Sequence, residues 1–306
     1  MSLLGPEDPP IDQILEAIDE MAASPQPKVL LFDIGGVCVI SPFQAILDYE
    51  LSLSIPPGWI NYSISRSAPS GAWHKLERGA IPLDKHFFAA FNADLHKPEN
   101  WKTFYDREAS RHPDRLPKQT PPIPKMDGEW LFNEMMSASN APDPWMFPAL
   151  KKLKQSGKYI IGALSNTVIF PESHKLHKAD FFKDALRSQF DVFISSAHVG
   201  IRKPDPRMYK LAVETLDTFA RGNAGTKRGR KYGWEAGVKS QDILFLDDIG
   251  ENLKAAKKEG FETVKVPLGR AYEAVEKLEK VTGLELDGGH PKVAIKPSIK
   301  GSKAKI

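Results

Sequence analysis

The sequence predicts an α/β fold, a doubly wound parallel sheet with a helical cap inserted after its first strand. Three observations support this prediction: apolar runs of strand length recur along the chain, most of them end in small polar or acidic residues, and helical stretches separate the runs. Strands that alternate with helices form parallel sheets joined by right-handed crossovers.

The bulk composition is that of a globular protein outside the membrane. The chain has 306 residues, of which 41% are hydrophobic and 26% charged, which is typical of a main domain with a smaller companion. No apolar run approaches the roughly 18 residues of a spanning helix, and the first residues lack the basic and apolar regions of a secretory signal. The single cysteine, Cys38, fits a reducing compartment, so we expect a cytoplasmic protein with no membrane partner.

The formal charge of +3 is small for this length, and part of it lies in two basic segments, residues 227–231 and the tail from 292 to 306. We interpret these as a solvated loop and a frayed tail, which predicts no nucleic-acid partner. The last three residues, Ala304-Lys305-Ile306, resemble a conservative variant of the peroxisomal address Ser-Lys-Leu. A peroxisomal location is therefore the alternative to a cytoplasmic one.

Five segments are expected to form strands. The first, residues 29–32, is apolar throughout, as in a strand buried on both faces. The others are expected at residues 159–164, 192–194, 243–246 and 262–266. Because the carboxyl ends of parallel strands meet at one edge of the sheet, where open α/β proteins bind ligands, the residues that follow the strands should converge. They include Asp33, Ser165 and the Asp247-Asp248 pair.

Helices are expected before and between these strands. Apolar residues at helical spacing predict an amphipathic helix at residues 11–22. Between the strands, helices are expected at 145–155, 207–216 and 251–258. The segment 221–240 is rich in glycine and basic residues and is expected to be mobile.

More than a hundred residues separate the first two strands, too many for one crossover, so a separate element must be inserted there. Its helices are expected at 43–53, 71–78, 83–94 and 129–137. Five prolines within residues 113–124 predict a stiff, irregular segment. An insertion at the ligand-binding edge acts as a lid. The expected division is a core of residues 1–40 and 141–290, a cap of 41–140 and a flexible tail of 291–306.

Four segments, in order along the chain, resemble the motifs of the haloacid dehalogenase (HAD) superfamily. They are residues 32–37 (FDIGGV), 164–167 (LSNT), 200–206 (GIRKPDP) and 245–248 (FLDD) with Asn252. The resemblance covers about residues 28–285 and implies a Rossmann-like core, Asp33 as nucleophile, an aspartyl-phosphate intermediate and Mg²⁺ as cofactor. The cap segment 73–81 (WHKLERGAI) is similar to a group that includes the amino-terminal domain of soluble epoxide hydrolase and the related domain of an acyl-CoA dehydrogenase family.

The chemistry of phosphate displacement supports these assignments. It needs an in-line nucleophile, positive charge on the phosphate oxygens, and a cation that lets an anionic carboxylate approach an anionic substrate. Hard oxygen ligands favour Mg²⁺, and the expected metal-binding positions are Asp33, Gly35, Asp247 and Asp248. The expected catalytic residues are Asp33, Lys203 and Ser165. The expected phosphate-binding residues are Ile34, Gly35, Ser165, Asn166 and Lys203.

These residues also have structural interpretations. Asp33 can be a turn residue, Ser165 a helix cap and Lys203 a surface lysine, and the Asp247-Asp248 pair can cap the helix that follows it. Asn252 is either a site residue or a structural hydrogen bonder. In the cap, four residues either select the substrate or form a solvated helix face: His74, Lys75, Glu77 and Arg78. Cys38 is expected in the core.

Gly35 departs from the family's pattern, because most phosphatases of this family carry a second aspartate there as general acid and base. That contribution is roughly 10²–10⁴-fold. The first interpretation is a phosphatase for a small phosphorylated metabolite whose leaving group needs little protonation, such as a sugar 1-phosphate or an acyl phosphate, or one whose cap supplies the proton. The second is a metal-independent 2-haloacid dehalogenase, since halide leaves unprotonated, and the third is a non-catalytic phosphate-, metal- or partner-binding protein. The sequence favours the first, with Mg²⁺-dependent hydrolysis of a phosphate ester.

Overall fold

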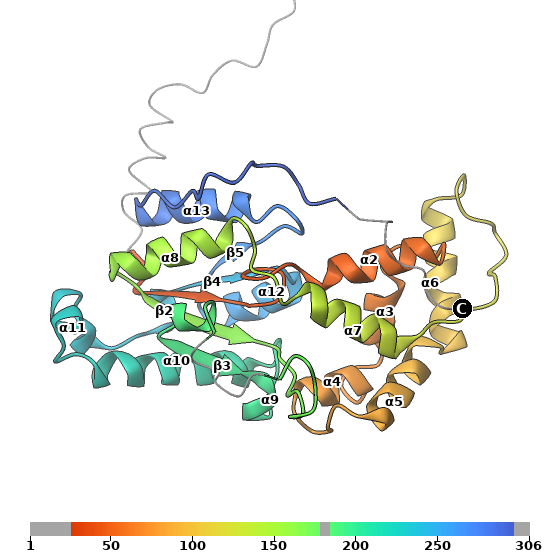
Figure 1. Cartoon of the computed structure of the whole chain (residues 1–306), viewed down its shortest axis with the longest axis horizontal. Coiled ribbons are helices and arrows are strands. Elements are labelled where there is room, and N and C mark those ends of the chain that lie inside the picture. The colour runs from red at the N-terminus through yellow and green to blue at the C-terminus, as the bar shows by residue number, and fades with distance from the viewer. Residues whose placement is uncertain (1–25, 178–183, 297–306) are drawn as a thin grey trace, which may run out of the picture.

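The computed structural model describes residues 26–177 and 184–296. Their five strands form one parallel sheet in the order β3-β2-β1-β4-β5 (Figure 1). The strands are β1 (Val29–Phe32), β2 (Ile160–Ser165), β3 (Val192–Ser195), β4 (Ile243–Asp247) and β5 (Glu262–Lys265). Each predicted strand is confirmed to within one residue at either end.

Helices cover both faces of the sheet, as the predicted doubly wound fold requires. Alternate residues of β1 face opposite layers, and all of them are fully buried. One face packs against α8 (Met146–Ser156) and α13 (Tyr272–Thr282), and the other against α10 (Pro206–Gly222) and α12 (Gly250–Lys258). Figure 1 shows α8 and α13 above the sheet and α10 below it.

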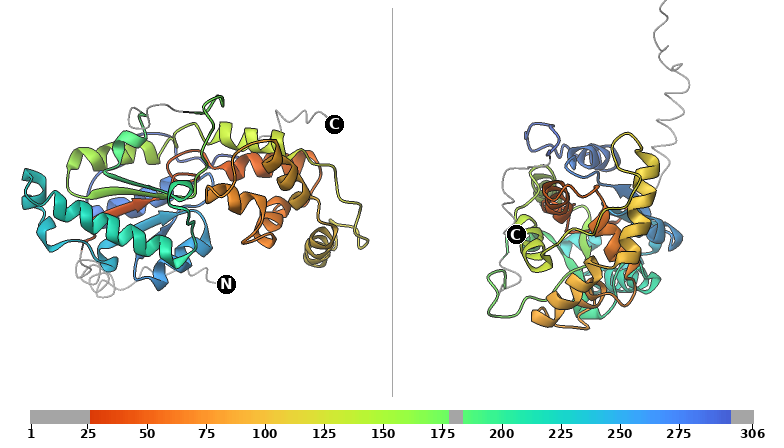
Figure 2. Two further views of the ribbon diagram at one scale, coloured as in Figure 1. Left: turned by 90° about the horizontal axis from the view of Figure 1, so that it is seen from below. Right: turned by 90° about the vertical axis from the view of Figure 1, so that its right-hand side faces the viewer.

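Seven helices lie between β1 and β2, and the first six of them form the cap. These six are α2 (Pro42–Ser52), α3 (Trp59–Arg66), α4 (Ala72–Glu77), α5 (Lys85–Leu95), α6 (Pro98–Arg111) and α7 (Gly128–Ala138). They pack around a hydrophobic core of their own, rich in aromatic side chains, and lie at one end of the molecule (Figure 2, left). Residues 112–127 contain neither helix nor strand, which confirms the irregular proline-rich segment.

The two connections between core and cap are hydrogen-bonded to each other as an antiparallel pair. Ile40 N donates to Ala141 O at 2.9 Å, and Asp143 N donates to Cys38 O at 3.0 Å. Cys38 is fully buried, as predicted for a core residue. The cap therefore joins the core through a paired ribbon, and the division of the chain at residues 40/41 and 140/141 remains a prediction.

The segment 221–240 is more structured than a solvated loop. It contains the short helix α11 (Lys227–Lys231) and the 3₁₀ turn η3 (Trp234–Ala236). Arg228 is partly buried, and its guanidinium binds Asp191 at 3.0 Å and the carbonyl of Gly157 at 2.8 Å. The interpretation of residues 227–231 as a solvated loop is therefore wrong at Arg228, because a buried carboxylate holds it. The remaining short elements are α9 (Ser196–Val199), η2 (Arg187–Gln189) and η4 (Ser240–Asp242).

Two predicted features lie outside the described residues: the helix at 11–22 and the C-terminal tripeptide 304–306. The beginning of the predicted tail is described, and Ile295 N donates to Gly269 O at 2.9 Å. In the ranges 26–177 and 184–296, no helix has both the length and the apolar character that crossing a bilayer requires.

Candidate active site

Three carboxylates meet at the carboxyl edge of the sheet. β1 and β4 are neighbours in which Phe32 pairs with Leu246, so Asp33 and Asp247 stand side by side at the strand ends. One oxygen each from Asp33, Asp247 and Asp248 lie within 4.8 Å of one another. These side chains therefore converge, as the sheet topology predicts.

Lys203 is fully buried between two of these carboxylates. Its Nζ lies 3.0 Å from Oδ2 of Asp33 and 2.7 Å from Oδ2 of Asp247. Burial by itself lowers the pKa of Lys203, but Asp247 and Asp33 outweigh it and raise the pKa above its ordinary value. Lys203 is therefore a charged group within the cluster and not a surface lysine.

The carboxylates carry more negative charge than Lys203 balances. Burial raises the pKa of Asp33 to about 6, against the opposing effect of Lys203. Burial, followed by the charges of Asp33 and Asp247, raises the pKa of Asp248 well above its ordinary value. A divalent cation bound here would supply the missing positive charge and let all of these carboxylates ionise.

Asp248 has one buried oxygen, Oδ2, without a hydrogen-bond partner among the described residues. Gly36 makes room for this oxygen: its φ is +76°, and a Cβ there would stand 2.1 Å from Oδ2. A buried acceptor without a partner costs about 1–3 kcal/mol, and more when it is charged. An oxygen-rich donor set with one orphaned carboxylate oxygen fits a hard cation such as Mg²⁺.

Asp247 is held by groups at the start of α12. Nδ2 of Asn252 lies 3.1 Å from each oxygen of Asp247, and Ile249 N donates to its Oδ1 at 2.7 Å. The Asn252 carbonyl accepts from the hydroxyl of Tyr209 at 2.9 Å. Asn252 thus positions Asp247 through hydrogen bonds. Of the two interpretations that the sequence left open for Asn252, this is the structural one.

Ser165 and Asn166 follow β2, which is the other neighbour of β1. Ser165 is buried, and its side chain acts to lower the pKa of Asp33. Residues 166–170 are not helical, so Ser165 caps no helix. The Asn166 side chain forms two hydrogen bonds with the backbone of Lys203. Its Nδ2 donates to Lys203 O at 3.1 Å, and its Oδ1 accepts from Lys203 N at 2.8 Å.

The first two residues after Asp33 differ in what they offer a ligand. Ile34 N donates to Oδ1 of Asp33 at 2.7 Å, so this expected phosphate donor already has an acceptor. Gly35 lines the cavity described below. A Cβ at Gly35 would meet only Pro42, at 3.7 Å, which is ordinary van der Waals contact. Position 35 therefore has room for a side chain.

A cavity of about 420 Å³ lies over the carboxylates, between core and cap, and is within the size range of small-molecule sites. Its core side includes Asp33, Gly35, Asn166, Asp248 and Asn252. The cap contributes mainly apolar side chains, among them Phe43, Ile46, Ile64, Trp73 and Met135. Three further lining residues are His74, Glu77 and Arg202. The cavity is thus polar at the carboxylates, and its cap side combines these apolar side chains with the polar Asn61, Ser65, His74 and Glu77.

The residues of α4 divide between this cavity and the solvent. His74 and Glu77 are buried and line the cavity, whereas Lys75 is exposed. Oε2 of Glu77 lies 2.7 Å from Nε of Arg202. The solvated-face interpretation is therefore wrong for His74 and Glu77. Sequence reasoning missed Arg202, although it directly precedes Lys203.

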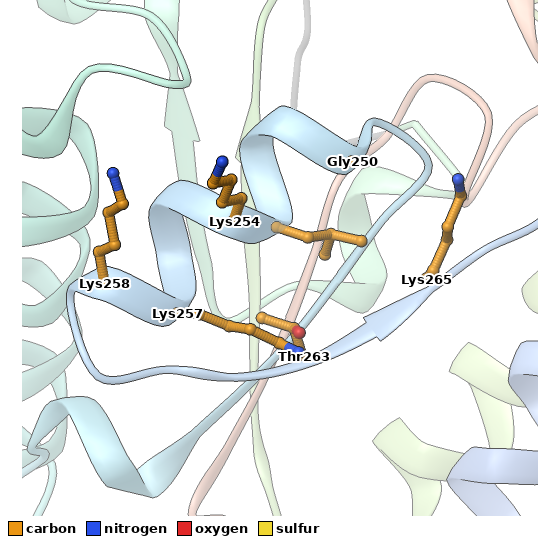
Figure 3. Close-up of a pocket in the computed structure, with 7 residues that line it drawn as sticks. Gly250, Lys254, Lys257, Lys258, Thr263 and Lys265 are labelled. Atoms are coloured by element: carbon orange, nitrogen blue, oxygen red, sulfur yellow. The ribbon is translucent and has the colours of Figure 1, made fainter.

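A second hollow, of about 560 Å³, lies between α12 and β5. Four lysines line it: Lys254, Lys257, Lys258 and Lys265. Figure 3 shows Lys257 extending toward Thr263. No acidic side chain lines this hollow, so it has no counterpart of the carboxylate cluster.

A family model described as a haloacid dehalogenase-like hydrolase matches residues 27–260 of this chain. The chain is similar to acyl-CoA dehydrogenase family member 10 of Mus musculus, at 26% identity over 86% of this chain and 20% of the relative. It is also similar to bifunctional epoxide hydrolase 2 of Rattus norvegicus, at 24% identity over 89% of this chain and 44% of the relative. A third relative is sesquiterpene phosphatase astK of Aspergillus oryzae, at 25% identity over 76% of this chain and 86% of the relative. The chain therefore spans less than half the length of the first two relatives, which are of the two kinds that residues 73–81 resemble.

Proposed function

The chain belongs to the haloacid dehalogenase-like hydrolases, and from this premise we propose that it is a magnesium-dependent phosphatase acting on a small phosphate ester. One observation carries the proposal: ligand oxygens of Asp33, Asp247 and Asp248 lie within 4.8 Å of one another, with Lys203 buried beside them. Phosphoryl transfer needs this combination of a carboxylate nucleophile and concentrated positive charge. The similarity to a sesquiterpene phosphatase supports the reaction class.

Asp33 is the proposed nucleophile. One of its oxygens accepts from Ile34 N and the other lies 3.0 Å from Lys203 Nζ. These contacts orient the carboxylate, and Lys203 opposes the rise in its pKa that burial causes. An Asp33 oxygen attacks phosphorus, the bond to the leaving oxygen breaks, and an aspartyl phosphate remains. Water then attacks the same phosphorus, which releases phosphate and returns Asp33.

The other residues of the cluster hold the phosphate and the metal. Lys203 and Ser165 are proposed to contact phosphoryl oxygens, with Asn166 fixing the Lys203 backbone as it does now. The proposed Mg²⁺ ligands are Asp33, Asp247, Asp248 and the backbone of Gly35. When bound, the ion would screen the repulsion between carboxylate and phosphate and polarise the phosphoryl group.

The cavity supports a substrate with an apolar organic group. Aromatic and aliphatic side chains of the cap line one side, including Phe43, Trp73 and Met135, while the carboxylates lie on the other. Burial of apolar surface contributes about 25 cal/mol per Å², so such a wall favours an apolar alcohol over a sugar. We therefore expect phosphate esters of apolar alcohols to bind more tightly than sugar phosphates.

Turnover of p-nitrophenyl phosphate tests the reaction. We expect hydrolysis in Mg²⁺ and none in EDTA, and we expect Asp33→Asn to abolish it. The matched control is Asp114→Asn, an exposed aspartate of the irregular cap segment, which should retain wild-type turnover. Equal activity of wild type and Asp33→Asn would contradict the proposal.

The second candidate function is a 2-haloacid dehalogenase. The absence of an acid at Gly35 is compatible with it, because halide departs without a proton. The buried Asp247 and Asp248 carboxylates argue against it, since they favour a cation that such a reaction does not need. Release of chloride from 2-chloropropionate in EDTA would identify the dehalogenase. Absence of both activities would favour the non-catalytic phosphate-, metal- or partner-binding protein.

A further inference from the structure

The carboxylate cluster contains no separate acid for the leaving group, because position 35 is glycine. An alkoxide leaves slowly unless it is protonated, and general acid catalysis contributes roughly 10²–10⁴-fold. We propose that Glu77, on cap helix α4, donates the proton to the leaving oxygen. This inference rests on the phosphatase function proposed above.

Glu77 is tied to the segment that holds the nucleophile. It lines the same cavity as Asp33 and Gly35. Its Oε2 lies 2.7 Å from Nε of Arg202. Arg202 is the neighbour of Lys203 in the chain, and Nζ of Lys203 lies 3.0 Å from Oδ2 of Asp33. The consecutive residues Arg202 and Lys203 thus bind Glu77 and Asp33, respectively.

The core also fixes the end of α4 that carries Glu77. The hydroxyl of Ser196, on α9, donates to the carbonyl of Glu77 at 2.5 Å. Gly79 packs so closely on α9 that a Cβ there would stand 2.3 Å from the Ala197 carbonyl oxygen. A proton donor must be held within about 0.5 Å of its working position, and these contacts restrain the backbone of Glu77 although it belongs to the cap.

The surroundings favour a protonated Glu77 more than water does. Burial raises the pKa of Glu77 above its ordinary value, although Arg202, a hydrogen bond from Trp73 and the charge of Lys203 act in the opposite direction. Arg202 contacts Oε2, and the proposed proton is on Oε1. The direction of this shift favours the role of a proton donor.

The other ionisable groups near α4 are less suited to this task. Burial, followed by the charges of Arg202 and Arg78, lowers the pKa of His74 to about 4, so His74 is neutral at pH 7 and has no acidic proton to give. Asp94, on α5, accepts from Ala72 N at 2.8 Å, and His198, on α9, hydrogen-bonds the Ser195 hydroxyl at 2.7 Å. Neither Asp94 nor His198 lines the cavity.

Glu77 gives up its proton in the first step and regains one in the second. As Asp33 bonds to phosphorus, the electron pair of the breaking P–O bond moves to the leaving oxygen, which takes the proton of Glu77 and departs as the alcohol. Glu77 is left as a carboxylate. It then accepts a proton from the water that attacks the aspartyl phosphate, so phosphate leaves and Glu77 is neutral again.

Leaving-group dependence tests this role. We expect Glu77→Gln to slow the first turnover of hexyl phosphate by about 10²-fold or more, because without the acid the leaving group must depart as the hexyl alkoxide. The first turnover of p-nitrophenyl phosphate should keep its wild-type rate, since p-nitrophenolate needs no proton. Slow hydrolysis of the aspartyl phosphate should then produce a burst of one equivalent of p-nitrophenolate. Glu134→Gln, an exposed glutamate on α7, is the matched control and should behave as wild type.

A second variant separates proton transfer from a merely structural role. Adding Gly35→Asp to Glu77→Gln supplies a carboxyl group from the core and should restore hexyl phosphate turnover. Equal slowing of both first turnovers, or no rescue by Gly35→Asp, would overturn the role of Glu77 while leaving the phosphatase intact. Failure of the wild type to hydrolyse p-nitrophenyl phosphate in Mg²⁺ would instead overturn the phosphatase and this inference with it.

Discussion

Gly36 stands directly against Asp248, so that a Cβ on Gly36 would lie 2.1 Å from the Asp248 Oδ2 atom. With its φ of +76°, the glycine both forms the turn after Asp33 and leaves space for a buried carboxylate. We expect Gly36→Ala to displace Asp248 and weaken Mg²⁺ binding by about tenfold or more, since one ligand is lost. Isothermal titration with Mg²⁺ measures this. Gly222→Ala, where an added Cβ meets nothing within 4 Å, should bind Mg²⁺ as wild type does.

Gly35→Asp should raise activity instead of lowering it. An added side chain meets only Pro42, at 3.7 Å, and the new carboxyl group would lie in the cavity as a second acid. In the Glu77→Gln background, where no other acid is proposed, we expect kcat for alkyl phosphates to rise by roughly 10-fold or more, with little change in the first turnover of p-nitrophenyl phosphate. Gly35→Asn has the same shape without the acid, and an equal rise in that variant would contradict the explanation.

Glu50 should make the free energy of unfolding depend on pH. It accepts from Gly58 N and Ile60 N, each at 2.7 Å, yet burial raises its pKa from 4.5 to about 7. Between these two pH values the folded protein keeps a proton that the unfolded chain releases, so the contribution of Glu50 to stability falls as pH rises through this window. Urea unfolding of wild type and Glu50→Gln should show the wild type losing more stability from pH 4.5 to pH 7. A constant difference between the two proteins would contradict this, and Glu134→Gln should parallel the wild type.

Arg228 should matter for stability even though it lies in a basic surface segment. Its guanidinium binds Asp191, whose side chain is only 7% exposed, together with the carbonyl of Gly157. Arg228→Ala leaves Asp191 with Lys154 as its remaining cationic partner, so we expect a loss of about 2 kcal/mol. Chemical denaturation measures the loss. Lys231→Ala, an exposed residue of the same helix, should change stability by less than about 0.5 kcal/mol.

The strands and the carboxylate cluster could be predicted from sequence because they follow local rules. A run such as residues 29–32 is apolar on both faces, which is the pattern of a central parallel strand. Once the strands are parallel, topology brings Asp33 and Asp247 to one edge without further information. Lys203 follows from the family resemblance, and its buried position between two carboxylates agrees with that expectation.

The cap was less predictable because its contacts are tertiary. α6 buries only Trp101, Phe104 and Tyr105 along its length, too few apolar residues to reveal a helix by periodicity. The pairing of Glu77 with Arg202 joins residues more than a hundred positions apart and depends on how α4 docks on α9. No spacing rule contains that information, although the position of Arg202 beside Lys203 was a usable signal.

The paired ribbon between core and cap restricts how substrate enters and product leaves. Hydrogen bonds from Ile40 to Ala141 and from Asp143 to Cys38 join the two connections, so we expect the cap to tilt about this ribbon and not to swivel. A tilt that widens the cavity must first separate Glu77 from Ser196 and Arg202. We therefore expect bulk water to enter only while the proposed acid is withdrawn, which would keep solvent exchange apart from bond cleavage.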